Sequence, residues 1–82
     1  MSKQLVVSST YEQFIQWCRQ TNTNPLTAWH ATKPEQLRGI RRDIPVIVLE
    51  PWLDRTERGL ARRHHMMQIL RAKGNSKTWV HT

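Results

Sequence analysis

Pro45-Val46-Ile47-Val48-Leu49 is the most continuous apolar stretch in the chain. An apolar strand with no polar alternation is typical of parallel sheets, because helices cover both faces of such a sheet. Residues 45–49 therefore predict a strand at or near the centre of an open α/β sheet.

Residues 5–7, Leu-Val-Val, predict a second buried strand that leads directly into a helix. Ser9 and Glu12 have the spacing of a capping box, which would start that helix. Residues 21–25 are turn formers followed by a proline, so they are expected to end it. Between these signals, apolar residues recur with the spacing of one helical face: Tyr11, Phe14, Ile15 and Cys18.

Residues 26–32 are too short and too bounded for a good helix and fit another strand. This strand is the most polar of those predicted, so we expect it at an edge of the sheet. Thr32 and Glu35 repeat the cap spacing around Pro34, which predicts a short helix to about Arg38. Gly39 is the expected residue to end it.

The last part of the chain predicts a long helix and a final strand. Asp54 and Glu57 form a third cap signature, and the helix is expected to run to Lys73 and end at Gly74. Residues 77–81 alternate weakly between polar and apolar, so they predict a strand, with a tail as the alternative. The apolar stripe of the long helix is expected to be Leu60, Met66, Met67 and Leu70.

Strands that alternate with helices imply parallel pairing through right-handed crossovers. With the polar second strand at an edge, the expected order is two-one-three, with the fourth strand beside the third. The predicted fold is a Rossmann-like miniature: a three- to four-stranded, mostly parallel open sheet with three helices (βαβαβα and a final short strand). Residues 1–82 are expected to form one domain, since a chain of this size folds around a single small core.

The formal net charge of +7 is distributed unevenly. Residues 1–37 carry three Lys or Arg against two Asp or Glu, whereas residues 38–82 carry ten against four. Such a field attracts nucleic acid, acidic proteins and anionic membranes by the same physics, so it selects no partner by itself. No apolar run approaches the ~20 residues that span a bilayer, and no signal peptide is recognisable. We therefore expect a cytoplasmic protein without a membrane partner.

Ligands of open α/β sheets bind beyond the carboxyl ends of the strands, where the strand order reverses. The expected order places Ser8, Ser9 and Thr10 at that point, opposite residues 50–52. Amides and hydroxyls at a helix start can bind an anion such as phosphate. The turn contains no glycine, however, so helix capping is the alternative role for these three residues.

No catalytic, metal or cofactor site is predicted. His64 and His65 are adjacent and point about 100° apart on a helix, so they cannot chelate one ion as an i, i+4 pair would. Cys18 lies on the apolar helical face and is expected to be a buried small hydrophobe. Asp54 and Glu57 are assigned to helix capping. Because no nucleophile, metal-binding or cofactor-binding motif then remains, no enzymatic activity is expected.

Arginine dominates the basic surface, and its planar fork binds phosphate or carboxylate with two hydrogen bonds. Arg63 falls near the apolar stripe and is expected to pair with a carboxylate. A merely solvated basic face is the alternative to a binding role. The predicted partner-binding residues are Arg55, Arg58 and Arg62, with Arg41, Arg42 and Trp52.

The chain also resembles small uncharacterised α/β proteins carried by phages of actinobacteria, over roughly residues 4–73. The residues that carry the resemblance are Tyr11, Phe14, Trp17, Cys18, Asn24, Pro25, Ala28, residues 37–39 (Leu-Arg-Gly) and residues 45–49. The resemblance implies an accessory protein in the cytoplasm of an infected bacterium and transfers no functional site.

The resemblance to phage proteins and the exposed arginines together favour docking on a host or viral protein, with nucleic acid as the alternative partner. A phosphate-ligand or nucleotide-processing role at residues 8–10 is a third hypothesis. The protein is expected to be a monomer or a homodimer, since the second strand could pair with its own copy.

Overall fold

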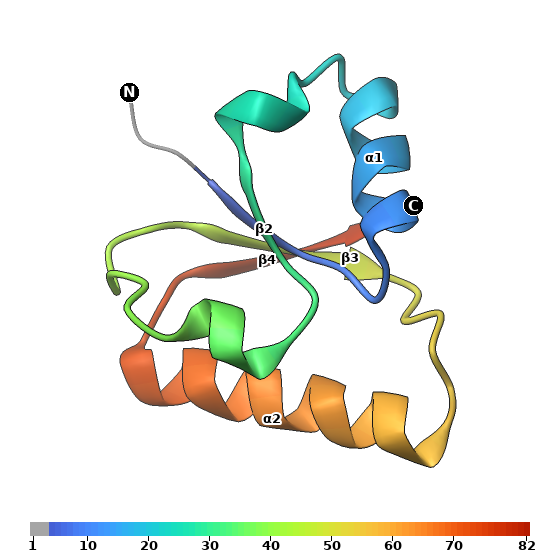
Figure 1. The fold of residues 1–82 in the computed structure, drawn as a ribbon. Coiled ribbons are helices and arrows are strands. Elements are labelled where there is room, and N and C mark those ends of the chain that lie inside the picture. Colours follow the sequence, from blue (N-terminus) through green and yellow to red (C-terminus); the bar gives the residue numbers. More distant parts are fainter. Residues whose placement is uncertain (1–3) are drawn as a thin grey trace.

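The computed structural model describes residues 4–82, which form a four-stranded sheet with helices on both faces (Figure 1). The strands are all parallel and lie in the order β2-β1-β3-β4. The predicted order is therefore confirmed, with the second strand at one edge and the fourth beside the third. The strand bounds are β1 (Leu5–Val7), β2 (Trp29–Ala31), β3 (Val46–Glu50) and β4 (Lys77–His81).

The strand predicted to be central pairs on both sides. Three residues of β3 pair with β1, and all five pair with β4. Successive residues point to opposite faces, so Val46 and Val48 join one apolar cluster and Leu49 joins the other. Both faces of β3 are covered, which explains why its sequence is an unbroken apolar run.

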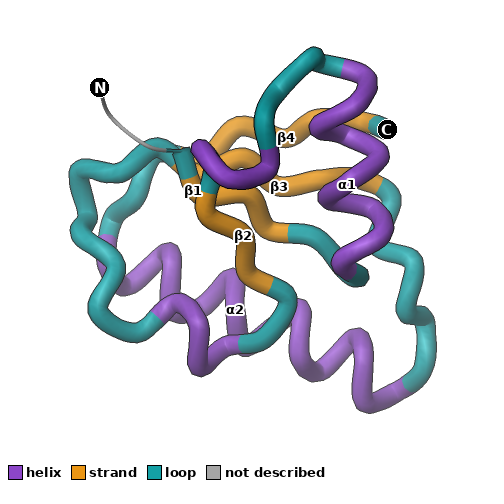
Figure 2. Tube along the Cα trace, turned by 45° about the horizontal axis from the view of Figure 1, so that its top comes forward, coloured by secondary structure: helices purple, strands orange, loops and turns teal. Residues whose placement is uncertain are grey.

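Each α-helix covers one face of the sheet (Figures 1 and 2). Helix α1 (Tyr11–Gln20) packs Phe14, Trp17 and Cys18 against Val6 and Leu49. Helix α2 (Glu57–Lys73) packs through Met66 and Leu70 on the opposite face. It ends at Gly74, whose left-handed backbone (φ +76°) confirms the predicted stop.

The prediction of three helices is wrong, because residues 34–37 form a short 3-10 helix, η2 (Pro34–Leu37), instead of an α-helix. Pro34 begins it, and Gly39 turns the chain with φ +80°, so too few residues lie between them to propagate α-helical turns. Gln36, not the predicted Glu35, binds the preceding backbone: its Oε1 accepts from the amide of Thr32 at 2.7 Å.

Strand β2 is also shorter than residues 26–32. A second 3-10 helix, η1 (Pro25–Thr27), occupies the start of that stretch and leaves Leu26 exposed. Asn24 caps η1 by accepting a hydrogen bond from the amide of Leu26. Only residues 29–31 then pair with β1.

The helix caps lie one or two residues later than predicted. Thr10, not Ser9, caps α1 by accepting from the amide of Gln13 at 3.2 Å. Thr56, not Asp54, caps α2 by accepting from the amide of Gly59 at 3.0 Å. Both places offer more than one capping residue, Ser9 and Thr10 before α1 and Asp54 and Thr56 before α2, and residue spacing does not reveal which of them has the extended backbone that a cap needs.

The apolar stripe of α2 differs from the prediction at one position. Met66 and Leu70 are buried and Met67 is partly buried, whereas Leu60 is 50% exposed. Gly59 faces the interior in its place. A glycine leaves no apolar mark in the sequence, so the spacing of apolar residues does not identify position 59 as buried.

Candidate functional site

The chain reverses its direction of winding between β1 and β3, which lie side by side at the centre of the sheet. As predicted, the residues that follow β1 meet the residues that follow β3 at this point. The backbone amide of Leu53 donates a hydrogen bond to Ser9 Oγ at 3.1 Å. A ligand crevice would be expected here in an open α/β sheet.

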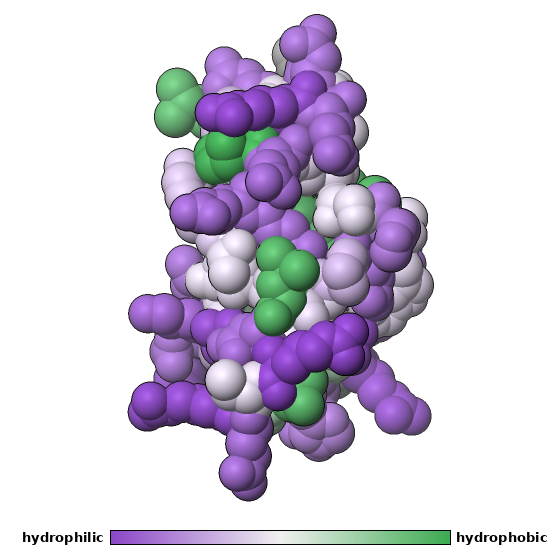
Figure 3. Space-filling view, turned by 90° about the vertical axis from the view of Figure 1, so that its right-hand side faces the viewer, coloured by the Kyte–Doolittle hydropathy of each residue, from purple (hydrophilic) through white to green (hydrophobic). Residues whose placement is uncertain are grey.

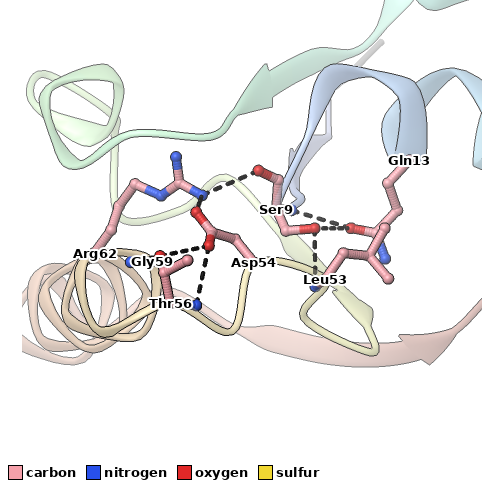
Figure 4. A network of polar contacts seen from close by, with 7 residues as sticks. All are labelled: Ser9, Gln13, Leu53, Asp54, Thr56, Gly59 and Arg62. Carbon is pink, nitrogen blue, oxygen red and sulfur yellow. Dashed lines mark hydrogen bonds and ion pairs between the residues drawn. The ribbon is translucent and has the colours of Figure 1, made fainter.

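The side chain of Gln13 fills this crevice from α1 (Figure 4). Its Oε1 accepts from both the amide and the hydroxyl of Ser9 at 3.0 Å, and its Nε2 donates to the carbonyl of Pro51 at 2.8 Å. Ser8 is fully buried and donates its hydroxyl to the carbonyl of Thr10 at 2.8 Å. The donors of Ser9 and the hydroxyl of Ser8 are thus bonded within the protein, and the carboxamide oxygen of Gln13 lies where an anion would have to sit.

Arg62 closes the same region from α2 (Figure 4). Its guanidinium donates to the carbonyl of Ser9 at 3.2 Å and pairs with Asp54 at 3.3 Å. It also lies over the ring of Trp52, 5.3 Å from the ring centre. Arg62 therefore joins the loop after β1 to the loop after β3 and is only partly available to a partner.

Asp54 is held at this junction by the start of α2. Its Oδ1 accepts from the hydroxyl of Thr56 at 2.7 Å and from the amide of Thr56 at 3.2 Å. These two hydrogen bonds, with a smaller contribution from Arg62, hold the pKa of Asp54 below its ordinary value. The carboxylate stays ionised and lies directly over Gly59.

Substituting Gly59→Ala is expected to lower the melting temperature by several degrees, although alanine is the better helix former by about 1 kcal/mol. A Cβ at position 59 would overlap the carboxylate of Asp54, which would have to leave Thr56 and Arg62. In an Asp54→Ala background the same substitution should raise the melting temperature. Thermal unfolding by circular dichroism measures both, and a stabilised single variant would contradict the contact.

Trp52 was predicted to face a partner, but the structure buries it to 5% exposure. Its ring belongs to the apolar cluster beneath α2, with Met66 and Leu70. The tryptophans with substantial exposure are Trp29 (41%) and Trp79 (51%). The prediction of Trp52 as a partner-binding residue is therefore wrong, because the loop after β3 turns its ring back over the sheet.

Trp79 is the exposed aromatic residue next to arginine on α2. The guanidinium of Arg63 lies 6.0 Å from the centre of its ring and donates to Glu50 at 3.1 Å. The predicted pairing of Arg63 with a carboxylate is therefore confirmed. Alternation in β4 is the signal that could have identified Trp79, because Val80 faces the α1 side and its neighbour must face the other.

The predicted arginines do not form one cluster. Arg55 and Arg58 are exposed at the start of α2, whereas Arg41 and Arg42 lie in the loop at its other end. Asn75 fixes that loop by donating to the carbonyls of Arg41 and Ile44, both at 3.0 Å. The helix between the two groups is about 25 Å long at 1.5 Å per residue. Arg41 also pairs with Asp43 at 3.3 Å.

A hollow of about 610 Å³ lies between η2 and the first half of α2. Figure 3 views the molecule from the side to which the strands point, and strongly hydrophilic side chains gather over α2. The hollow combines cations with carboxylates, so it is not a purely cationic cradle. Its charged and titratable lining residues are Lys33, Arg58, Arg62, His65, Glu35 and Asp54.

Within residues 4–82, no three His, Cys, Asp or Glu side chains come together as a metal-binding group would require. Cys18 is buried against the sheet, and this burial raises the pKa of its thiol. Over the same described part of the chain, neither α-helix is both long and apolar enough to cross a membrane.

These observations define a small parallel α/β sheet protein whose central crevice is filled by its own side chains and whose α2 side carries most of the exposed arginines. No protein-family model, no curated protein and no solved structure matches the chain.

Proposed function

We propose that this protein is a non-enzymatic binding module, a phage-encoded accessory protein that docks on a host or viral protein through the α2 side of its sheet. The observation that carries the proposal is a set of exposed arginines that do not pair with a carboxylate of the protein. Among the described residues on this side, five arginines make no ion pair: Arg38, Arg42, Arg55, Arg58 and Arg71.

The opposite side of the sheet has no such excess. Helix α1 carries one cation and one carboxylate, Arg19 and Glu12, and η1 carries neither. Charges that served only solubility would be expected on both sides of the sheet. Unpaired arginines on one face instead suit a partner that supplies the missing carboxylates.

Trp79 adds an aromatic anchor on the same side of the sheet. Its ring is half-exposed and contacts Arg63. Tryptophan and arginine are the residue types enriched at the energetic centres of protein interfaces. In this proposal Trp79, and not the predicted Trp52, is the tryptophan that contacts the partner.

Nucleic acid is the second candidate, favoured by one specific observation. Unpaired arginines lie at both ends of α2, Arg42 at one and Arg58 at the other, about 25 Å apart by helix length. An elongated polyanion could contact both ends at once through its phosphates. Such binding would be backbone-directed and would weaken steeply with salt.

Reversing the charge of Arg58 tests the proposal, with Arg19→Glu as a matched control. Both residues are exposed and form no ion pair, and both substitutions change the net charge equally on opposite sides of the sheet. In affinity capture from nuclease-treated bacterial host lysate, Arg58→Glu is expected to lower recovery of a protein partner about tenfold or more, and Arg19→Glu to leave it unchanged.

Equal recovery for the two variants would overturn docking through α2. Capture that disappears after nuclease treatment would favour the nucleic-acid candidate. In that case Arg42→Glu and Arg58→Glu should weaken duplex DNA binding to a similar extent, with a smaller salt dependence for each variant.

A further inference from the structure

Strand β4 forms an open edge of the sheet, and its hydrogen bonds show which backbone groups face outward. The amide of Val46 donates to the carbonyl of Ser76, and the amide of Thr82 donates to the carbonyl of Glu50. In a parallel ladder, this hydrogen-bond pattern means that the backbone N–H and C=O groups of the even-numbered residues of β4 point toward β3. The N–H and C=O groups of Lys77, Trp79 and His81 therefore point away from the sheet.

None of these outward groups has a protein partner among residues 4–82. The other edge strand, β2, has three residues, whereas β4 has five. Exposed edges of this kind are templates for a further strand. Strand β4 is thus the longer of the two edges on which a segment could add.

The side chains along the edge carry a consistent chemistry. Lys77, Trp79 and His81 alternate onto the α2 face of the sheet, where Arg63 lies over the ring of Trp79. Thr78 and Val80 point to the α1 face. One face of the edge therefore carries Lys77 and Arg63 around an exposed aromatic ring, with Glu50 as the carboxylate that pairs with Arg63. The other face carries only short, uncharged side chains.

We propose that β4 binds an extended acidic segment of a partner protein, which adds as a fifth strand at this edge. The inference rests on the proposed function, because it specifies how the protein partner docks. Backbone groups of Lys77, Trp79 and His81 would supply the hydrogen bonds. Carboxylates opposite Lys77 and His81, and a β-branched or aromatic residue opposite Trp79, would supply the favourable cross-strand pairs.

Charge favours an acidic segment of a partner protein over a second copy of the chain as the strand that adds to β4. Two β4 strands that pair antiparallel around Trp79 would place Lys77 opposite His81 of the other copy, which offers the lysine no carboxylate. Each copy also carries a net charge of +7, so long-range repulsion opposes the approach. A lysine on an edge strand is itself a common device against such self-pairing.

The test uses the full chain and a synthetic peptide, acetyl-Gly-Glu-Val-Tyr-Thr-Glu-Gly-amide, followed by amide hydrogen exchange. In the free protein the amides of Lys77, Trp79 and His81 should exchange rapidly, while those of Thr78 and Val80 are protected. The peptide should slow exchange at the three outward amides about tenfold or more. A matched peptide with Lys in place of both Glu residues should leave them unprotected.

Two peptides with a single N-methyl group separate edge pairing from simple charge attraction. One is methylated at Tyr and the other at the adjacent Thr, so their N–H groups point to opposite sides of the added strand. One should lose binding and the other keep it. Equal effects, or no protection of the outward amides at about 1 mM peptide, would overturn the proposal.

Variants of the protein supply the complementary control. Trp79→Pro removes an outward N–H without breaking the ladder to β3, and proline is tolerated at such edge positions. It should abolish peptide binding, whereas Trp79→Ala should only weaken it. Concentration-dependent protection of the same amides without peptide would overturn the proposal in favour of a dimer.

The two proposals fail in different ways. If Arg58-dependent capture of a protein persists but the peptide does not protect β4, the edge proposal fails and the proposed function stands. If the peptide binds but capture does not depend on Arg58, edge pairing stands and docking through the arginines of α2 fails.

Discussion

Replacing Leu70 with alanine is expected to lower the free energy of unfolding by about 2–5 kcal/mol. Leu70 is completely buried and packs in the cluster between α2 and the sheet, with Val46, Val48 and Met66. The substitution removes apolar contacts and leaves a cavity that the surrounding strands can only partly close. A domain of this size has a total stability of about 4–12 kcal/mol, so the substitution would remove a large part of it.

Urea denaturation followed by tryptophan fluorescence measures the loss, and Leu60→Ala is the matched control. Leu60 is on the same helix and was assigned to the same stripe, but half of its surface is exposed. Its replacement should cost less than about 1 kcal/mol. Similar losses for the two variants would show that α2 is rotated from the orientation described.

The second large effect is expected from Gln13→Leu, which should lower the free energy of unfolding by about 2–4 kcal/mol. Leucine fits the volume but removes the partner of the amide and hydroxyl of Ser9 and of the carbonyl of Pro51. Ser9 is buried, so water cannot readily replace the lost hydrogen bonds. The measurement is again urea denaturation.

Gln16→Leu is the control, because Gln16 is exposed on the same helix. It should change stability by less than about 0.5 kcal/mol. Gln13→Glu separates the two halves of the contact: a carboxylate still accepts from Ser9 but cannot donate to Pro51. If Gln13→Leu is as stable as the wild type, the filled crevice contributes nothing to the fold.

The strands could be predicted because their signals are local. The unbroken apolar run of residues 45–49 requires cover on both faces, and this fixed β3 at the centre. Gly74 ends α2 as predicted, since a left-handed residue favours glycine. The polarity of residues 26–32 identified the edge strand, because a strand that pairs on one side only tolerates polar side chains.

The candidate site was less predictable, because its residues meet only through tertiary packing. Gln13 has no motif, and its role appears only when α1 places it beside Pro51. Nothing in the local sequence shows that the loop after β3 turns Trp52 inward. The role of Gly59 is also invisible in the sequence, because it consists of leaving space for the side chain of Asp54.

The uneven distribution of charge across the sheet gives the molecule a permanent electric dipole. Arg19 and Glu12 nearly cancel on the α1 side, while the α2 side keeps its excess of arginine. In the field of an anionic partner such a dipole experiences a torque, so the protein turns its α2 side toward the partner before contact. Fewer encounters then fail through wrong orientation, and the gain in association rate disappears as salt screens the field.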